Sequence, residues 1–173
     1  MDEVGRGALA GPVVVAAVQI VAEVDGVTDS KQIPKSFHGP LADKLKNACS
    51  LVRFGQASNA EIDRLGIIVA LALAYERALK GLKADLVLTD HYNLPTNHRF
   101  IRATKGDSLF YSVAAASIIA KTYRDLLMST YDRFCPDYGW AKNAGYGTRA
   151  HIDAIQQHGQ TPLHRQSFNT KRR

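Results

Sequence analysis

Apolar residues gather in short stretches that predict strands buried in a sheet. Residues 12–20 form an almost unbroken Val- and Ala-rich run, which is typical of a central strand covered on both faces. Residues 51–57 predict a second strand. Two shorter strands are expected at residues 85–89, ending at Asp90, and at residues 99–102.

Helices are expected between and after these strands. Ser58 and Glu61 have the spacing of a capping box, which predicts a helix that begins at Ser58 and continues to about Lys80, where Gly81 ends it. Residues 108–131 predict a second helix, rich in Ala, that packs closely on the sheet.

Single residues predict the boundaries of two further helices. Thr148 is suited to cap a last helix over residues 149–158, and Gly159 ends it. Because proline is tolerated in a first helical turn, another helix is expected to start at Pro40 or Leu41. Strands that come first and helices that interleave later predict an α/β fold with a mixed sheet.

Length and composition indicate one globular unit. The 173 residues contain no repeats or linker-like stretches, so we expect a single domain over residues 1–173. The longest apolar runs are too short to span a bilayer. Cys49 and Cys135 form no disulfide framework, which favours a reducing cytoplasm. A formal net charge of +6 is compatible with a polyanionic partner and equally with a basic solvated surface.

Four acidic residues stand at the expected ends of strands and helices: Asp2, Glu3, Asp90 and Asp107. Functional groups gather at strand ends along one edge of an α/β sheet. Carboxylates brought close together repel, and Mg²⁺ or Mn²⁺, which prefer oxygen ligands, resolve that conflict. Two such ions about 3.5–4 Å apart can activate a water and stabilise the leaving oxygen in phosphodiester cleavage.

Each acid also has an ordinary structural interpretation. Asp2 and Glu3 fit a solvated terminus, Asp107 fits a helix N-cap, and Asp90 fits the start of a turn. Spacing along the chain does not show that the four converge, so both interpretations stay open at this point.

The segments around these acids carry a family resemblance. The opening Asp2-Glu3-Val4-Gly5-Arg6-Gly7, continuing to Gly11-Pro12-Val13-Val14, resembles the first block of bacterial ribonuclease HII. Four more segments follow in the family's order: Asp29-Ser30-Lys31, Lys105-Gly106-Asp107, Ala114-Ala115-Ala116-Ser117-Ile118-Ile119-Ala120-Lys121 with Arg124-Asp125, and Gly145-Tyr146-Gly147-Thr148 with His151, leading to His164-Arg165 and Ser167-Phe168. This ordered set covers nearly the whole chain.

The resemblance implies a ribonuclease H-like fold, with a five-stranded mixed sheet flanked by helices and a C-terminal helical region. It places the catalytic, metal-binding quartet on Asp2, Glu3, Asp90 and Asp107, with two Mn²⁺ or Mg²⁺ ions in the reacting complex. It also implies an endonuclease that cuts the RNA strand of RNA–DNA hybrids. The family cuts on the 5′ side of a ribonucleotide, even a single one embedded in duplex DNA, and leaves a 3′-hydroxyl and a 5′-phosphate. The expected partners are these duplexes, and the expected acting form is a monomer.

Two segments near the acids are candidate substrate-binding sites. The glycines of Gly5-Arg6-Gly7 let the backbone approach a ligand closely, and the 2′-hydroxyl is the group that distinguishes RNA from DNA. The resemblance assigns the reading of that hydroxyl to this turn, and Arg6 suits a phosphate. Tyr146 lies between two glycines and can stack on an exposed sugar or base, where the family has a junction-sensing tyrosine. The ordinary alternatives are a plain tight turn and a core or surface tyrosine.

Other polar residues are weaker candidates. Ser30 and Lys31 suit phosphate contacts in a loop, or belong to a solvated loop. Lys121 and Arg124 share one helix face, which fits a solvent face or ion pairs as well as a substrate. The His164-Arg165 pair is interpreted as structural or substrate-facing, and not as catalytic.

Three features depart from the family pattern. Only Met1 precedes Asp2, so the first strand is expected to be shortened and its end liable to fray. An α-amino group within about 7 Å of Glu3 is expected to compete with metal and to weaken metal affinity or stability. His91 stands where many members have glycine, and residues 37–40 lack the usual charged helix start.

Four other functions have weaker support in the sequence. Type HIII ribonucleases usually carry an added N-terminal domain and a lysine at the position of Arg6. A non-catalytic duplex-binding module fits the short start, although all four acids are present. The histidines form no H-E-x-x-H pattern, which disfavours a zinc hydrolase, and a small-molecule phosphatase has no sequence support. Recruitment by a sliding clamp stays open.

Overall fold

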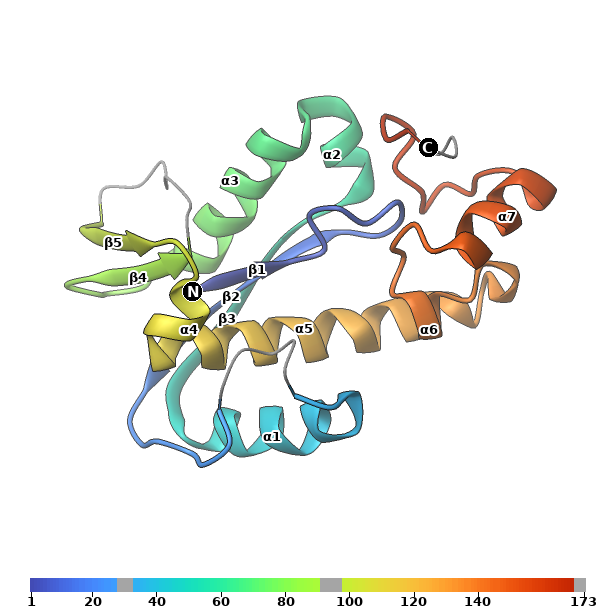
Figure 1. The fold of residues 1–173 in the computed structure, drawn as a ribbon. Helices are drawn as coiled ribbons and strands as arrows, with labels where there is room; N and C mark the ends of the chain where they lie inside the picture. Colours follow the sequence, from blue (N-terminus) through green and yellow to red (C-terminus); the bar gives the residue numbers. More distant parts are fainter. Residues whose placement is uncertain (28–32, 91–97, 170–173) are drawn as a thin grey trace.

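Helices cover both faces of a central group of strands (Figure 1). The computed structural model describes residues 1–27, 33–90 and 98–169. Strands β1 (Asp2–Val4), β2 (Val13–Ile20) and β3 (Cys49–Ala57) pair antiparallel in the order β1-β2-β3. Strands β4 (Val87–Asp90) and β5 (Phe100–Ala103) pair in parallel. The amino group of Met1 donates a hydrogen bond to the carbonyl oxygen of Leu88 at 2.8 Å, so the start of the chain connects the two sets. Both parallel and antiparallel pairs are therefore present, as predicted.

Strand β2 is the centre of the core. Its residues from Val13 to Ala17 are all buried, which confirms the strand predicted over residues 12–20. Because side chains alternate along a strand, Val13, Val15 and Ala17 pack into one apolar cluster, and Ala16 packs into another on the opposite face. The Val- and Ala-rich run is the direct cause of this two-sided burial.

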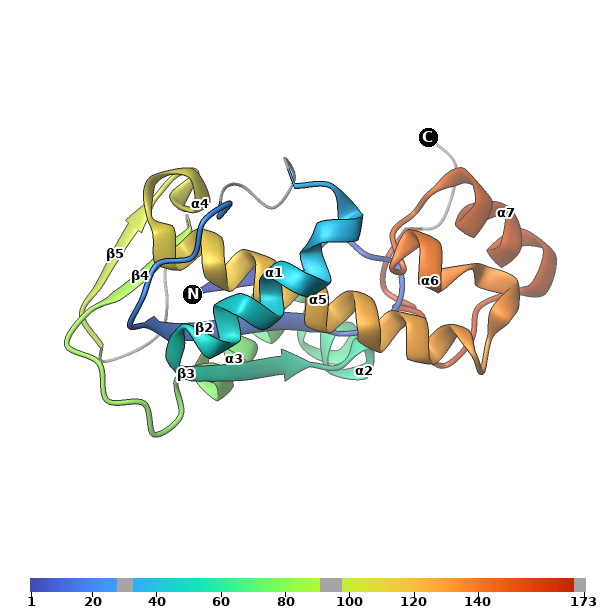
Figure 2. The same ribbon diagram turned by 90° about the horizontal axis from the view of Figure 1, so that it is seen from below.

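The two clusters are completed by helices from different parts of the chain. Helices α2 (Asn59–Leu65) and α3 (Ile67–Leu79) lie on one side of the sheet, and α3 packs on β2 and β3. On the other side, α5 (Tyr111–Asp132) packs on β1 and β2, and α1 (Lys35–Asn47) crosses α5 (Figure 2). The small side chains of α5 allow the close approach that its Ala-rich sequence predicted.

Two predicted helices are interrupted. The helix predicted from Ser58 to Lys80 begins with the expected capping box, yet Gly66 divides it into α2 and α3. Gly66 has φ +77, a left-handed conformation that glycine adopts without steric cost and that no helix interior accommodates. The helix predicted at residues 108–131 begins earlier, as the short α4 (Gly106–Leu109), and Phe110 in an extended conformation separates α4 from α5.

The predicted start of α1 was wrong. The helix begins at Lys35, after Pro34 at the N-cap, and Pro40 lies inside it. A proline within a helix removes the hydrogen bond that its missing N–H would donate to the residue four positions earlier, and its ring crowds the carbonyl group of that residue. That residue is Ser36, which is exposed in the first turn, so the cost of the lost bond is small.

The C-terminal helical region is confirmed. It consists of the 3₁₀ turn η1 (Pro136–Tyr138), α6 (Trp140–Asn143) and α7 (Arg149–His158). The Thr148 side chain caps α7 by accepting from the N–H of His151, and Gly159 follows the helix, as predicted. These helices share an apolar cluster with Leu9 and Ala10 from the loop after β1. None of the described helices combines the length and apolar character that crossing a membrane requires.

Candidate active site

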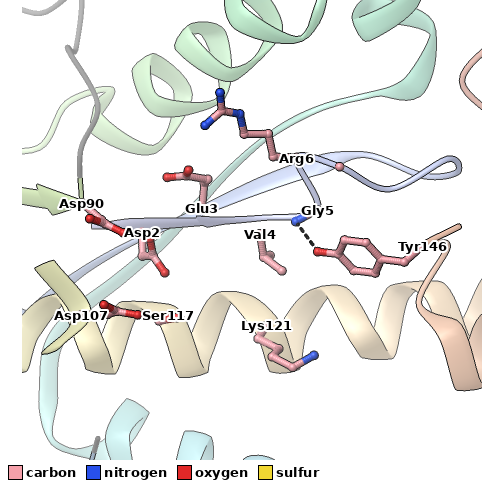
Figure 3. Close-up of a pocket in the computed structure, with 11 residues that line it drawn as sticks. Asp2, Glu3, Val4, Gly5, Arg6, Asp90, Asp107, Ser117, Lys121 and Tyr146 are labelled. Atoms are coloured by element: carbon pink, nitrogen blue, oxygen red, sulfur yellow. Dashed lines mark hydrogen bonds between the residues drawn. The ribbon is translucent and has the colours of Figure 1, made fainter. Parts of the chain in front are cut away.

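The four acidic residues singled out in the sequence lie around one cavity. It has a volume of about 410 Å³ and is also lined by the turn after β1 and by residues of α5 (Figure 3). The lining residues are Asp2, Glu3, Val4, Gly5, Arg6, Gly7, Asp90, Asp107, Ser117, Lys121 and Tyr146. The convergence that spacing alone left open is therefore present in the fold.

Asp2 and Glu3 point to opposite sides of β1, because successive side chains of a strand alternate. Asp2 turns toward α5, where Ser117 hydrogen-bonds to it, and Glu3 turns toward α3 (Figure 3). The hydroxyl of Tyr75 on α3 donates to Glu3 Oε2 at 2.6 Å. Each acid of the pair is thus held by one hydroxyl from the helix on its own side of the sheet.

Burial leaves these two carboxylates poorly compensated. Burial, and then the charge of Glu3, raise the pKa of Asp2 to about 7, and Ser117 only partly opposes this. Burial also raises the pKa of Glu3 above its usual value, against the hydrogen bond from Tyr75. Both shifts mean that burial outweighs the nearby positive charges, which are the amino group of Met1 for Asp2 and Arg6 for Glu3.

Asp90 and Asp107 come from the adjoining strand and helix. Asp90 is the last residue of β4, and its Oδ1 accepts from the main-chain N–H of Gly106 at 3.1 Å. Asp107 follows in the first turn of α4. The N-cap of α4 is Lys105, which makes no side-chain cap hydrogen bond. The interpretation of Asp107 as an N-cap was therefore wrong, and its carboxylate is left facing the cavity.

The cavity suits a hard divalent cation in its chemistry. Its acidic donors are all carboxylate oxygens, which Mg²⁺ and Mn²⁺ prefer, and a cation would relieve the uncompensated charge of Asp2 and Glu3. Within the described part of the chain, no three acidic, histidine or cysteine side chains lie close enough together to hold an ion as they stand. The four acids line the cavity, but their side chains are not close enough together to coordinate one ion in this conformation.

The start of the chain is more ordered than expected. Met1 is buried, and its amino group is bound to Leu88, so the predicted fraying was wrong. Burial lowers the pKa of this amino group to about 6, although the charges of Asp2 and Glu3 oppose the shift. Near neutral pH the group is therefore largely uncharged, which weakens its competition with a cation for the carboxylates.

The turn after β1 contacts Tyr146 directly. Gly5 has φ +87, which is accessible to glycine and strained for other residues. Its N–H donates to the hydroxyl of Tyr146 at 3.1 Å (Figure 3). Tyr146 lies in an irregular segment before α7, as predicted, and Arg124 lies 5.4 Å from the centre of its ring. The two candidate substrate-binding segments thus form one surface beside the acids.

Other candidates differ in their placement. Lys121 lines the cavity and forms an ion pair with Asp125 at 2.9 Å. Arg124 is fully buried, so its interpretation as part of a solvent face was wrong. Ser30, Lys31 and His91 lie outside the described residues.

Two functionally placed residues were missed as site residues in the sequence, and a third, Arg165, was only a weak candidate. Tyr75 holds Glu3, Ser117 holds Asp2, and Arg165 holds the turn after β1 through three main-chain oxygens. Ser117 left one signal, since it is the only hydroxyl in an otherwise apolar stretch of α5 from Val113 to Ala120. Tyr75 left none, because its contact with Glu3 is 72 residues away in sequence. Arg165 belongs to a segment that carries the family resemblance, but its contact with the turn after β1 was not predicted.

Solved structures show the fold of the chain. The chain matches a chain in the structure of the PCNA:RNase HII complex from Archaeoglobus fulgidus with a TM-score of 0.83, covering 99% of this chain and 95% of that one at 24% identity. Ribonuclease H2 from Pyrococcus horikoshii OT3 gives a TM-score of 0.80, with 98% and 92% covered at 24% identity. Bst-RNase HIII in complex with Mn²⁺ gives 0.71, with 98% and 66% covered at 21% identity. The fold is the α/β ribonuclease H-like fold, with a mixed sheet and helices.

Sequence comparison identifies the family. The family model described as Ribonuclease HII matches residues 1–171. Ribonuclease HII of Lactobacillus johnsonii is 44% identical over 172 residues, which cover 97% of this chain and 69% of that protein. Ribonuclease HII of Lactobacillus helveticus is 45% identical with the same coverage. The chain belongs to the ribonuclease HII family, whose members are ribonuclease H enzymes acting on RNA–DNA hybrids.

Proposed function

We propose that this chain hydrolyses the RNA strand of RNA–DNA hybrids and also cuts on the 5′ side of a single ribonucleotide embedded in duplex DNA, leaving a 3′-hydroxyl and a 5′-phosphate. One observation carries the proposal. The four carboxylates share a cavity with the Gly5–Gly7 turn and Tyr146. Carboxylates suited to metal-assisted phosphodiester cleavage therefore lie beside a turn and a tyrosine suited to recognising a ribose.

Asp2, Glu3, Asp90 and Asp107 are the proposed ligands of two Mn²⁺ or Mg²⁺ ions. Their oxygen donors and the raised pKa values of Asp2 and Glu3 support this assignment. The Bst-RNase HIII structure in complex with Mn²⁺ is a relative by fold in which that metal is present. Such ions supply an activated water and charge stabilisation of the leaving 3′-oxygen.

The protein's own residues position the duplex. The backbone of Gly5, Arg6 and Gly7 is proposed to contact the 2′-hydroxyl and the adjoining phosphate, and Tyr146 to stack on the neighbouring sugar. Arg6 and Lys121 add positive charge at the cavity, which attracts the phosphate backbone. Ser30 and Lys31 are retained as predicted phosphate contacts.

One copy of the chain supplies every residue that the proposal uses, so we propose a monomer as the acting form. A reducing cytoplasm is the proposed location, consistent with free Cys49 and Cys135. In Archaeoglobus fulgidus an RNase HII forms a complex with PCNA, and the proposal for this chain does not depend on such a complex.

The test uses three end-labelled duplexes of one sequence: an all-RNA strand on DNA, a DNA duplex with one internal ribonucleotide, and an all-DNA duplex. Cleavage is measured with Mn²⁺, with Mg²⁺ and with EDTA, alongside Asp90→Asn as a matched control. We expect metal-dependent product from the first two duplexes and none from the third. Retained hybrid binding without product would instead identify a non-catalytic duplex-binding module.

A further inference from the structure

Two buried arginines lie directly behind the turn that lines the cavity. Arg124 on α5 and Arg165 after α7 are both fully buried. Among the described residues, no carboxylate lies within ion-pair distance of either guanidinium. Asp63 is the acid whose charge favours the ionised form of Arg165, but its own oxygens accept from Gln166 and Ser167. Such uncompensated buried charges are rare unless the surroundings need them.

Main-chain oxygens take the place of the missing acids. Arg165 donates from Nη2 to the oxygen of Gly5 at 2.7 Å, from Nη1 to that of Arg6 at 2.9 Å and from Nε to that of Gly11 at 3.0 Å. Arg124 likewise donates to three oxygens, those of Pro12, Ala10 and Ala144. Charge-assisted hydrogen bonds of this kind are stronger than neutral ones. Together the two guanidiniums fix the whole loop from Gly5 to Pro12.

The orientation of two carbonyl groups determines that of two N–H groups. In a trans peptide unit the C=O and the following N–H point in opposite directions, and no peptide bond of the described chain is cis. Because the oxygens of Gly5 and Arg6 point toward buried Arg165, the N–H groups of Arg6 and Gly7 point away from it. Both residues are exposed and line the cavity. Neither N–H has an acceptor within the described part of the chain.

We propose that Arg165 is a positioning residue that turns the N–H groups of Arg6 and Gly7 toward the cavity, where they bind an oxygen of the substrate's sugar–phosphate backbone. Two parallel donors form a concave site for an anionic or hydroxyl oxygen. The positive charges of Arg165 and Arg124 behind the turn polarise these peptide groups and favour a negative ligand. Burial and the nearby Arg124 lower the pKa of Arg165 to about 9, so it stays charged at neutral pH.

This inference rests on the proposed function and assigns a new role within it. Arg165 contacts neither the four carboxylates of the cavity nor the cavity itself. Its removal is therefore expected to affect recognition of the ribonucleotide only through the turn. Arg165→Lys keeps a charge but lacks the planar geometry that holds three oxygens at once. Arg165→Ala leaves space that added methylguanidinium can fill.

The experiment compares these variants with Ile155→Ala, which removes a buried side chain from the C-terminal apolar cluster but none of the hydrogen bonds that Arg165 donates to the turn. Cleavage of the single-ribonucleotide duplex and of the all-RNA hybrid is measured, together with the melting temperature. For Arg165→Ala and Arg165→Lys we expect the ratio of the two kcat/KM values to fall about tenfold, since buried carbonyls lose their donors. Methylguanidinium should restore the ratio in Arg165→Ala only. Amide spectra of ¹⁵N-labelled wild type with hybrid and Ca²⁺ should show Arg6 and Gly7 shifted, and this response should be lost in Arg165→Ala.

The outcomes separate this inference from the proposed function. If the wild type cuts neither duplex, the proposed function fails. If the wild type cuts both and the Arg165 variants keep the wild-type ratio, or lose both activities in proportion to stability as Ile155→Ala does, the positioning role is overturned.

Discussion

The N–H of Gly5 and the hydroxyl of Tyr146 are joined by a hydrogen bond of 3.1 Å across 141 residues of sequence. The bond links the turn after β1 to the irregular segment before α7, at the side of the cavity away from Asp90 (Figure 3). Because the hydroxyl accepts from Gly5, its own hydrogen is free to be donated to a substrate. The contact therefore couples the position of the ring to the position of the turn.

Tyr146→Phe tests this coupling. The substitution removes the hydroxyl that accepts from Gly5 while the ring can stay beside Arg124. We expect cleavage at a single ribonucleotide to fall about tenfold, as for loss of one well-placed hydrogen bond, with a smaller effect on a continuous hybrid. Initial rates on the two duplexes measure this, with Tyr131→Phe as control. Equal loss on both substrates would argue against a role in reading the junction.

Gly5→Ala is expected to destabilise the fold. The added Cβ would lie 2.2 Å from Arg124 Nε, in a conformation with φ +87. Backbone strain and overpacking together cost roughly 2–4 kcal/mol, or a fall in melting temperature on the order of 10 °C. Gly7→Ala is the matched control, because its Cβ meets nothing within 4 Å. Similar melting temperatures for the two variants would contradict the proposed tight fit at Gly5.

Local patterns in the sequence predicted the elements whose causes are local. The buried strand β2, the capping box at Ser58 and the cap of α7 at Thr148 each depend on residues within a few positions, and all three were found. The break at Gly66 was missed because an isolated glycine is often tolerated in a helical pattern. Its left-handed φ depends on how α2 and α3 pack on the rest of the fold. The local sequence pattern carries no information about that packing.

The site could be predicted only with the help of the family resemblance. Spacing did not show that Asp2 and Asp107 meet, since their approach depends on β1 and α4 lying at the same cavity. The burial of Arg124 was not predicted, because its spacing of three positions from Lys121 fitted a substrate contact, a solvent face or ion pairs equally. Its burial is made possible by the oxygens of Ala10, Pro12 and Ala144, which are 20 to 114 residues away.

Asp90→Asn and Asp107→Asn should each abolish cleavage while leaving hybrid binding and the fold largely intact. The amide is nearly isosteric with the carboxylate but neutral, so it is a poor ligand for Mg²⁺ or Mn²⁺. Product formation, hybrid affinity and melting temperature are measured for each variant. Asp43→Asn, on exposed α1, is the control and should cut normally. Normal cleavage by Asp90→Asn would exclude it from the proposed ligands.

Asp2→Asn should stabilise the protein in the absence of metal. Burial and the charge of Glu3 raise the pKa of Asp2 to about 7. Stability is therefore lost as the pH rises from the usual pKa of an aspartate toward 7, and at higher pH the whole loss is present. At pH 8 in EDTA we expect the variant to melt about 2–4 °C higher, corresponding to ~1 kcal/mol. Added Mn²⁺ should raise the melting temperature of the wild type by more than that of the variant. A lower melting temperature of Asp2→Asn than of the wild type in EDTA would show that the buried, ionised Asp2 carboxylate does not destabilise the fold.

A buried histidine pair is expected to make stability depend on pH. The N–H of Thr161 can only donate, so it fixes Nδ1 of His164 as an acceptor at 2.9 Å and leaves the hydrogen on Nε2. That hydrogen is donated to Nε2 of His151 at 3.1 Å, which also accepts from Trp140. Nδ1 of His151 then donates to the carbonyl oxygen of Tyr146 at 2.9 Å. Every position in this chain of hydrogen bonds requires both imidazoles to be neutral.

The sign of the pH effect follows from this neutrality. Burial, and then His151, lower the pKa of His164 to about 4, below its usual value of 6.5, and burial lowers the pKa of His151 as well. The aromatic groups packed against His164, Tyr138 and Trp140, bring no negative charge to offset protonation. Between pH 6.5 and about 4 the unfolded chain therefore binds protons that the folded chain does not, and stability is lost as the pH falls through this window. The loss is on the order of 1–3 kcal/mol at its low end.

Denaturant unfolding at pH 7 and at pH 5 measures this loss, and His164→Gln is the informative variant. Glutamine can still donate toward His151 but does not titrate, so the variant should be less stable at pH 7 and lose less stability on acidification than the wild type. His158→Gln, on the exposed end of α7, should keep the wild-type dependence. Because the chain of hydrogen bonds ends on Tyr146, cleavage at a single ribonucleotide should decline with acidification more steeply in the wild type than in His164→Gln. An unchanged dependence of stability on pH in His164→Gln would show that this pair is not the source of the effect.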